Sequence, residues 1–254
     1  MIMIISPAKT LDFSGEIYGK STVPTQLEES QILIDQLREL APDEIGKLMK
    51  ISENLSVLNW ERYRDFHTPF TVENARQALL AFKGDVYKGI EVDRYTDDEF
   101  DFAQNHLRIL SGLYGILRPL DLIQPYRLEM GTKLANQRGK NLYEFWGDRL
   151  SQKLNEDFEG YPDSYLVNLA SNEYFKAIAP KSLNAQVLNI TFKENKAGTY
   201  KVVGIHAKRA RGLMVDFVIK NRIQTIEPLQ DFGVESYEFN ESLSTPNEWV
   251  FCRG

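Results

Sequence analysis

Two glycines and an arginine in residues 110–131, LSGLYGILRPLDLIQPYRLEMG, have the types and spacing of a phosphate-binding turn. Gly112 and Gly115 stand between apolar residues, and Arg118 comes just before a proline. In a helix-hairpin-helix module, a glycine turn between two helices exposes backbone N–H groups to a phosphate, and a nearby arginine adds positive charge. We therefore predict such a turn here. The alternative is an ordinary helix–helix connection with a glycine cap.

Two more charged residues of the same segment, Arg127 and Glu129, are separated by one residue. They share one face if the chain is extended there, because side chains alternate along a strand. The pair could be a simple salt bridge, or it could line a site in which Arg127 binds an anion and Glu129 orients it. Glu129 is the acid that we expect inside a basic region, where Arg127 or Lys9 would neutralise it.

Further cations stand in loops beside predicted strands. Lys9 lies in the loop after the apolar run at residues 2–6, and residues 207–212, AKRARG, follow a second apolar run. Three cations within four residues cannot all be buried, so this segment is either a solvated connection or a contact with an anion, and arginine suits bidentate phosphate contacts. We predict that four cations share one concave region: Lys9, Arg127, Lys208 and Arg211.

A candidate polar site comes from the ends of two predicted strands. Asn168, Ser171 and Glu173 follow one apolar run, where they either cap the next helix or line a binding site. Ser6 ends the first strand of the chain, and Glu129 belongs to the charged pair above. If the protein is an enzyme, we expect its site to combine Glu129, Asn168, Ser171 and Glu173 of this group with three cations, Lys9, Arg127 and Lys208.

Other patterns of catalysis or metal binding are missing from the sequence. His67, His106 and His206 lack the spacing of metal ligands, and Cys252, the sole cysteine, has no neighbour that would make it a nucleophile. Neither a P-loop nor a dinucleotide-binding glycine pattern occurs. We therefore predict no cofactor and no metal site, and the catalytic residues stay unassigned.

The composition is that of a globular protein, with 254 residues of which 43% are hydrophobic. Apolar runs are all far shorter than the roughly 20 residues of a membrane span, and the start of the chain has no basic leader of a signal peptide. We expect a cytoplasmic protein without a membrane partner. The net charge of −6 argues against a general affinity for nucleic acid, but the basic stretches 106–140 and 193–222 could form one positive cleft. The alternative is that each stretch is a solvated face.

These segments need a mixed scaffold to position them. The apolar run at residues 2–6 predicts a buried strand, and Thr96 and Glu99 form the capping box of a helix that we expect to end near residue 110. Other helices are predicted at 26–40, 42–49, 52–66, 71–82, 142–154 and 212–223, a short helix is expected to start at Arg118, and strands are predicted at 165–171, 185–194, 199–208, 236–241 and 248–253. We predict an α/β (mixed α+β) fold, with residues 1–254 as one domain and a mixed sheet flanked by helices.

The longest motifs of the chain also resemble those of a known family. ISPAKTLDF, AFKGDVYKG, residues 101–131, LYEFWGD, VNLASNEYF, HAKRARG and MVDFVIKNRI resemble the YaaA family of bacterial peroxide-stress proteins nearly from end to end. The resemblance implies a cytosolic protein, induced under hydrogen peroxide, that limits free intracellular iron and so protects DNA from oxidation. It also implies a DNA-binding α/β fold with a positive cleft and a helix-hairpin-helix-like element, which matches residues 104–124.

Two functional hypotheses follow. The first is a non-enzymatic protein of peroxide defence that binds double-stranded DNA largely without sequence specificity. Its DNA- or anion-binding residues would be Lys9, Gly112, Gly115, Arg118, Arg127, Lys208, Arg209 and Arg211. The second is an enzyme that acts on an anionic small molecule, such as a nucleotide, in the same cleft. A long open groove would favour DNA, and a closed pocket with convergent polar groups would favour the enzyme.

Overall fold

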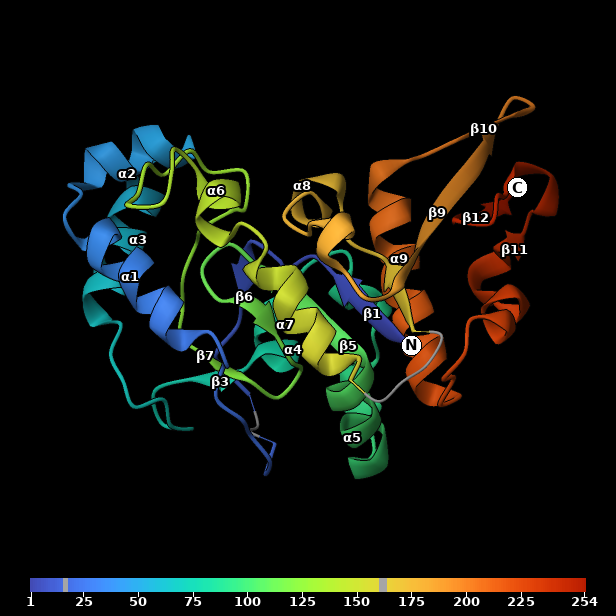
Figure 1. The fold of residues 1–254 in the computed structure, drawn as a ribbon, viewed down its shortest axis with the longest axis horizontal. Coiled ribbons are helices and arrows are strands. Elements are labelled where there is room, and N and C mark those ends of the chain that lie inside the picture. Colours follow the sequence, from blue (N-terminus) through green and yellow to red (C-terminus); the bar gives the residue numbers. More distant parts are fainter. Residues whose placement is uncertain (16–17, 160–163) are drawn as a thin grey trace.

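The strand β1 (Ile2–Ile5) consists of four consecutive apolar residues, and all four are buried. The computed structural model describes residues 1–15, 18–159 and 164–254. It has the predicted mixed α/β architecture, in which helices flank an eight-stranded mixed sheet (Figure 1). β1 lies inside this sheet, which explains why its sequence is a continuous apolar run without alternation.

The large sheet combines a parallel centre with antiparallel edges. Its other strands are β5 (Leu107–Ser111), β6 (Gly115–Leu117), β8 (Tyr165–Asn168), β9 (Gln186–Lys196), β10 (Thr199–Lys201), β11 (Glu238–Phe239) and β12 (Glu248–Arg253). The order is β11-β12-β9-β8-β1-β5-β6, and β10 pairs with β9. Neighbours from β12 to β5 are parallel, whereas β11, β6 and β10 pair antiparallel. Each of the antiparallel pairs β9–β10 and β11–β12 joins two strands that were predicted from the sequence.

β1 has a parallel partner on each side. Met3 pairs with Leu107 of β5 and with Val167 of β8. The chain therefore leaves β1 toward one side of the sheet and later returns to the other side. In open α/β sheets, such a reversal leaves a crevice outside the carboxyl ends of the strands, where ligands bind.

Some helices cover this sheet, and others gather beyond one end of it. α1 (Leu27–Arg38), α2 (Pro42–Met49) and α3 (Glu53–Asp65), all predicted, gather at the left of Figure 1. α5 (Asp97–His106) packs against β1 and β5, and α9 (Gly204–Lys220) packs against β9 and α5. The remaining elements are α4 (Ala78–Ala81), α6 (Leu142–Trp146), α7 (Arg149–Asp157), α8 (Asn172–Phe175), the short strands β2 (Thr10–Leu11), β3 (Arg76–Gln77), β4 (Phe82–Lys83) and β7 (Leu122–Ile123), and the 3₁₀ turns η1 (Tyr87–Gly89), η2 (Val92–Arg94), η3 (Pro180–Ser182), η4 (Glu227–Asp231), η5 (Val234–Ser236) and η6 (Glu241–Leu243).

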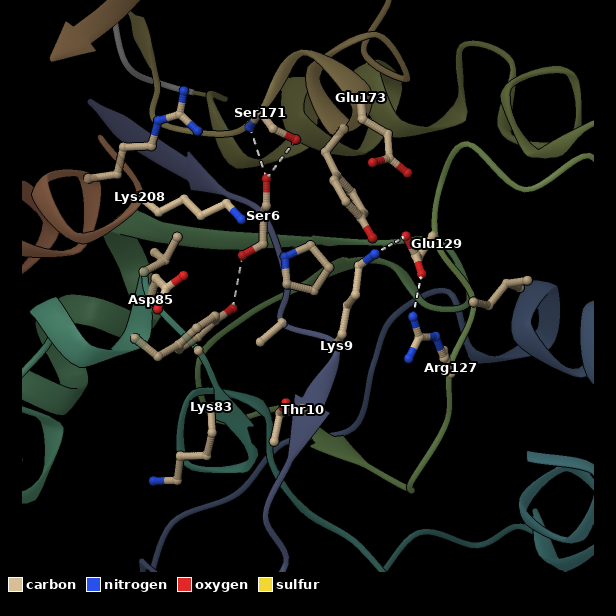
Figure 2. Close-up of a pocket in the computed structure, with 18 of the residues that line it drawn as sticks. Ser6, Lys9, Thr10, Lys83, Asp85, Arg127, Glu129, Ser171, Glu173 and Lys208 are labelled. Atoms are coloured by element: carbon tan, nitrogen blue, oxygen red, sulfur yellow. Dashed lines mark hydrogen bonds and ion pairs between the residues drawn. The ribbon is translucent and has the colours of Figure 1, made fainter. Parts of the chain in front are cut away.

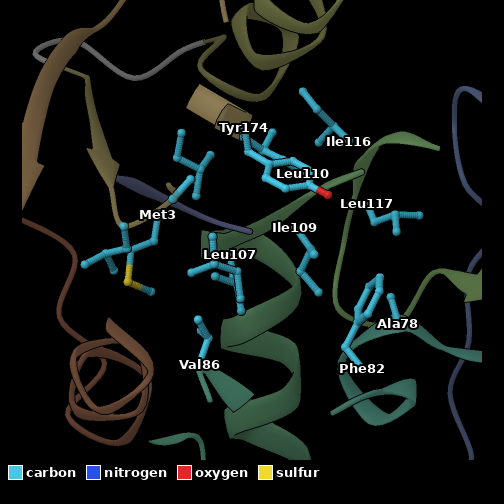
Figure 3. Packing of buried hydrophobic residues seen from close by; sticks show 14 of the residues in the cluster. Met3, Ala78, Phe82, Val86, Leu107, Ile109, Leu110, Ile116, Leu117 and Tyr174 are labelled. Carbon is cyan, nitrogen blue, oxygen red and sulfur yellow. The ribbon is translucent and has the colours of Figure 1, made fainter. Parts of the chain in front are cut away.

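The core around β5 draws side chains from distant parts of the chain (Figure 3). Leu107, Ile109 and Leu110 are fully buried although they do not all point to the same side of the strand. Met3 of β1 and Val86, next to η1, belong to the same cluster. Both faces of β5 are therefore covered by apolar side chains.

The helix predicted to run to residue 110 ends earlier, because β5 takes over its last turn. α5 begins at the predicted capping box, in which Glu99 Oε2 accepts a hydrogen bond from Thr96 N at 2.7 Å and Thr96 Oγ1 accepts one from Glu99 N at 3.3 Å. It ends at His106, and Leu107 begins the strand beside β1. Pairing with β1 outweighs the helical pattern of this apolar segment.

The predicted helix-hairpin-helix element at residues 104–124 is wrong. Ser111 pairs with Gly115, so the two glycines belong to a β-hairpin between β5 and β6, and Arg118 starts a turn instead of a helix. The N–H groups of Leu113 and Tyr114 donate to Ser111 Oγ at 3.2 and 2.9 Å, and both residues are buried. These N–H groups are therefore not available to a phosphate. Gly115 is needed for its φ of +69°.

Three other segments also differ from the prediction. In residues 71–82 only α4 is helical, because β3 before it pairs with β7 and the buried Gln77 donates to the carbonyls of Tyr18 and Lys20. The helix at 142–154 is divided into α6 and α7 at Gly147, whose φ is +54°. The strand predicted at 199–208 stops at Lys201, and the basic segment AKRARG lies within α9.

The contact between α9 and η1 generates a testable prediction. A Cβ atom added to Gly212 would overlap the carbonyl oxygen of Val86, which is backbone and cannot turn away. We expect Gly212→Ala to lower the free energy of unfolding by about 1–3 kcal/mol, the usual cost of overpacking, despite the better helix propensity of alanine. Denaturant unfolding measures this change.

Gly204→Ala is the matched control for this prediction. Gly204 begins the same helix, and a Cβ atom there would have no neighbour within 4 Å. This variant should be as stable as the parent or slightly more stable. Equal stability of the two variants would contradict the proposed close contact.

Candidate functional site

A pocket of about 440 Å³ opens outside the carboxyl ends of β1 and β8, where the order of strands in the sheet reverses (Figure 2). Five segments that are far apart in the sequence line it. They are residues 6–10 after β1, 83–87 before and within η1, 126–129, 171–174 around α8, and two residues of α9. The pocket therefore lies where the topology of the sheet predicts a binding crevice.

Cations outnumber acids in this pocket. Its charged residues are Lys9, Lys83, Arg127, Lys208 and Arg211 against Asp85, Glu129 and Glu173. The excess is positive although the whole chain has a net charge of −6. A concave surface of one sign of charge concentrates ligands of the opposite sign. The pocket is therefore suited to an anion.

The predicted meeting of four cations in one concave region is confirmed. Lys9, Arg127 and the two α9 residues Lys208 and Arg211 all line the pocket. Of the candidate polar residues, Ser6, Glu129, Ser171 and Glu173 also line it. Whether any of these residues binds a ligand stays a prediction.

Glu129 lies between two of the cations, as expected from its spacing. Its Oε2 is 2.7 Å from Lys9 Nζ, and its Oε1 accepts a hydrogen bond from Arg127 Nη2 at 3.0 Å. The Lys9 side chain is 64% exposed, whereas that of Arg127 is only 18% exposed. The bond to Arg127 is thus the less screened of the two, and Glu129 is neutralised within the basic region.

Two serines connect the loop after β1 to the start of α8. Ser6 Oγ accepts a hydrogen bond from Ser171 N at 2.9 Å and lies 3.3 Å from Ser171 Oγ. The carbonyl oxygen of Ser6 accepts a bond from the Tyr87 hydroxyl at 3.1 Å. These bonds hold the segments after β1, β8 and β4 together and leave the serine hydroxyls at the pocket surface (Figure 2).

Three buried tyrosines, Tyr87, Tyr126 and Tyr174, line the pocket. Burial raises the pKa of each phenol, because the charged phenolate would be poorly solvated there. The charges of Glu173 and Glu129 raise the pKa of Tyr174 further. At neutral pH the three hydroxyls are therefore uncharged. That of Tyr87 donates to the Ser6 carbonyl oxygen, and that of Tyr126 bonds to Ser111 Oγ at 2.7 Å.

Arg211 is the most sheltered cation at the α9 side of the pocket. Burial lowers the pKa of its guanidinium, and its Nε is buried without a hydrogen-bond partner. It forms no ion pair with any carboxylate in the described part of the chain. A partly buried, uncompensated charge beside a pocket is costly, and a bound anion would compensate it.

Several predicted site residues lie elsewhere. Gly112 and Gly115 belong to the buried β5–β6 turn. Arg118 pairs with the buried Asp121 at 3.0 Å, and Arg209 pairs with Glu235 at 2.7 Å, so neither lines the pocket. Asn168 bonds to Asn189 and to the backbone of Ala170, which keeps the end of β8 in register.

Other pocket residues were not predicted. Lys83, Asp85 and Tyr87 belong to the motif AFKGDVYKG, whose glycines and charged residues between apolar positions were the only signal in the sequence. The sequence around Tyr126 and Tyr174 does not distinguish them from aromatic residues of an ordinary core. Their place in the pocket depends on contacts between segments that are distant in sequence.

Within 1–15, 18–159 and 164–254, no three His, Cys, Asp or Glu side chains gather as metal ligands would. None of the helices in these ranges has the length and apolar character to cross a membrane.

Comparison with known proteins relates the whole chain to one group. The family model described as "Peroxide stress protein YaaA" matches residues 1–243. A UPF0246 protein of Acaryochloris marina is 63% identical over 253 residues, which cover 100% of both chains. A UPF0246 protein of Cellvibrio japonicus is 53% identical over 254 residues, which cover 100% of this chain and 98% of the relative.

The buried tyrosines generate a prediction about alkaline pH. Their pKa values are raised in the folded state, so their contribution to stability is complete below about pH 10, the pKa of an unfolded tyrosine, and is lost as the pH rises through the folded values. The free energy of unfolding should therefore fall between about pH 10 and 11.5, as measured by denaturant unfolding.

Tyr126→Phe tests the physical cause of this fall, because phenylalanine cannot ionise. Above about pH 10, the variant should lose stability less steeply than the parent, by up to about 1.4 kcal/mol per pH unit. A pH slope identical to that of the parent would show that Tyr126 does not contribute.

Proposed function

Because this chain belongs to the YaaA family of peroxide stress proteins, we propose that it acts in the peroxide stress response by binding double-stranded DNA. The contacts are made by the basic residues of the pocket and its rim, largely without sequence specificity. The observation that carries this proposal is the gathering of five cationic side chains around one opening in an acidic chain. In the proposal, residues 1–254 act as one domain in the cytoplasm.

Two of these cations are free to meet phosphate groups. Lys83 and Lys208 form no ion pair with a carboxylate in the described part of the chain, in contrast to Lys9. Phosphate contacts position a protein on DNA and supply affinity, but they carry no information about sequence. Binding through these residues would be general and sensitive to salt.

Protection of DNA and limitation of free intracellular iron complete this proposal, in agreement with the family resemblance. Bound protein displaces the cations that collect along the phosphate backbone, iron among them, and so keeps iron away from the DNA. Because the described residues do not group into a metal site, direct chelation of iron is not part of the proposal.

The shape of the pocket favours a second candidate function. A cavity of about 440 Å³ with serine, tyrosine and charged side chains pointing into it has the size and character of a small-molecule site. The second candidate is therefore binding of an anionic small molecule such as a nucleotide, as ligand or substrate, in the same pocket.

The first test removes the two pocket lysines that have no ion pair. Lys83→Ala together with Lys208→Ala should weaken binding to duplexes of any sequence alike and flatten the dependence of log affinity on log salt by about one unit per lost phosphate contact. Fluorescence anisotropy of two unrelated duplexes at several salt concentrations measures both effects.

The control for this test removes two exposed lysines outside the pocket. Lys20 pairs with Asp101, and Lys47 pairs with Asp43. Lys20→Ala with Lys47→Ala also removes two positive charges, so the net charge changes as much as in the pocket variant. This variant should keep the parental salt slope. A double pocket variant that keeps its slope but changes its sequence preference would contradict phosphate contacts.

The second test distinguishes the two candidate functions at Glu129. If the pocket only contacts DNA, Glu129→Gln should leave duplex affinity unchanged or slightly tighter, because one negative charge is lost. If Glu129 acts as a general acid or base, its loss should cost roughly a hundred-fold or more in rate. Duplex binding and survival of peroxide are measured together, with Glu156→Gln, an exposed residue of α7, as control. Unchanged binding with lost protection would argue against simple coating of DNA.

A further inference from the structure

One end of the pocket, here called the cationic end, consists of Ser6, Ser171, Lys208 and Arg211. Lys208 and Arg211 stand three residues apart on α9, so they project from the same face of the helix. Figure 2 shows the amine of Lys208 turned toward Ser6, whose hydroxyl neighbours that of Ser171. Two cations and two hydroxyls around one position are the donors that a phosphate group requires.

Neither Lys208 nor Arg211 forms an ion pair with a carboxylate of the described residues. Asp85, which Figure 2 shows beside Lys208, lies 3.3 Å from Lys88 and has its charge balanced there. Arg211 is half-buried and has no carboxylate partner among the described residues, as shown above. An anion bound at this end would therefore restore the charge balance.

The other end of the pocket has both acids and cations and offers a hydrogen-bond acceptor. Glu129 is neutralised by Lys9 and Arg127, but Glu173 has no ion pair within the described ranges. One of its oxygens, Oε1, accepts a hydrogen bond from Gly131 N at 2.9 Å. Its carboxylate can therefore accept further bonds from hydroxyl or amino groups of a ligand, on the side of Ser171 away from Lys208 (Figure 2).

Apolar and aromatic groups also line the pocket. They are Pro7, Ala8, Leu128, Tyr126 and Tyr174. A flat or apolar part of a ligand can pack on such a wall. The pocket thus suits a ligand with a phosphate at one end and hydroxyl or amino groups at the other.

The size of the pocket restricts the source of this phosphate. A duplex cannot enter a cavity of about 440 Å³, because the major groove of B-DNA alone is about 12 Å wide. A phosphate within an intact duplex therefore reaches only the rim. A single nucleotide, free or at the end of a strand, is small enough to enter.

We propose that the pocket binds one nucleotide unit by its terminal phosphate, with the phosphate at the cationic end and the sugar or base hydroxyl and amino groups at Glu173. This inference rests on the second candidate function and specifies its ligand class. The terminal phosphate has two sources, a free nucleotide or the 5′ end of a DNA strand, and it is recognised by the same contacts in both.

The test compares probes with and without the phosphate. Isothermal titration of the full chain with adenosine 5′-monophosphate and with adenosine should give an affinity at least about tenfold higher for the monophosphate, because hydrogen bonds to a charged phosphate are stronger than those to a neutral group. Lys208→Ala should abolish this difference. Lys220→Ala, on the same helix but paired with Glu99, should retain it.

A second arm distinguishes the two sources of the phosphate. Duplexes that differ only in a 5′-phosphate or a 5′-hydroxyl are compared in the same way, and preference for the phosphorylated end without binding of the monophosphate assigns the ligand to DNA ends. Equal affinity for adenosine and its monophosphate, together with equal affinity for the two duplexes, would overturn the proposal.

A covalently closed circular duplex separates this inference from the proposed DNA function. It has no ends, so its binding reports only on contacts between the rim and internal phosphates. Binding of the circle without any preference for terminal phosphates would overturn the pocket proposal and leave the DNA proposal intact. Binding of the monophosphate without binding of the circle would support the pocket proposal and reject the DNA proposal.

Discussion

The parallel pairing of β1 with β5 on one side and β8 on the other is the constraint on which the rest of the structure depends. β1 has only four residues, all apolar and all at most 4% exposed, and its backbone pairs with both neighbouring strands. Because the chain departs from β1 in one direction and returns in the other, a crevice forms outside the carboxyl ends of these strands. The pocket, the Ser6–Ser171 contact and the loop that carries Lys9 all result from this reversal.

A close contact between α9 and η1 completes the pocket on the side of α9. Gly212 and Gly89 let the backbone of α9 approach η1 more closely than any side chain would permit. This approach sets the rotation of α9, so that Lys208 and Arg211 face the pocket while Arg209, between them, faces Glu235. The same basic segment therefore supplies two pocket cations and one surface ion pair, and the difference arises from helix geometry alone.

An acidic protein produces a basic pocket here because many of its other cations pair with carboxylates outside the pocket. Arg118, Arg209 and Arg253 are held by carboxylates outside the pocket, whereas Lys83, Lys208 and Arg211 have no acidic partner in the described part of the chain. Glu129 does not cancel this excess, because its two oxygens are already occupied by Lys9 and Arg127. The net charge of a chain is thus a poor guide to its ligands, since local pairing determines the field that a ligand meets.

Features set by neighbours in sequence could be predicted from the sequence by itself. Five such features depend only on residues a few positions apart: the buried run of β1, the capping box of α5, the proline that opens α2, the β9–β10 turn and the Arg127–Glu129 pair. The long motifs also identified the family. Only the tertiary structure decided that residues 107–111 form a strand, that the Gly112–Gly115 turn is buried, and that Lys83 and Tyr174 meet Lys208 in one pocket. The physical reason is that pairing with β1 and packing between distant segments contribute more free energy than local helix propensity, and no local pattern encodes those partners.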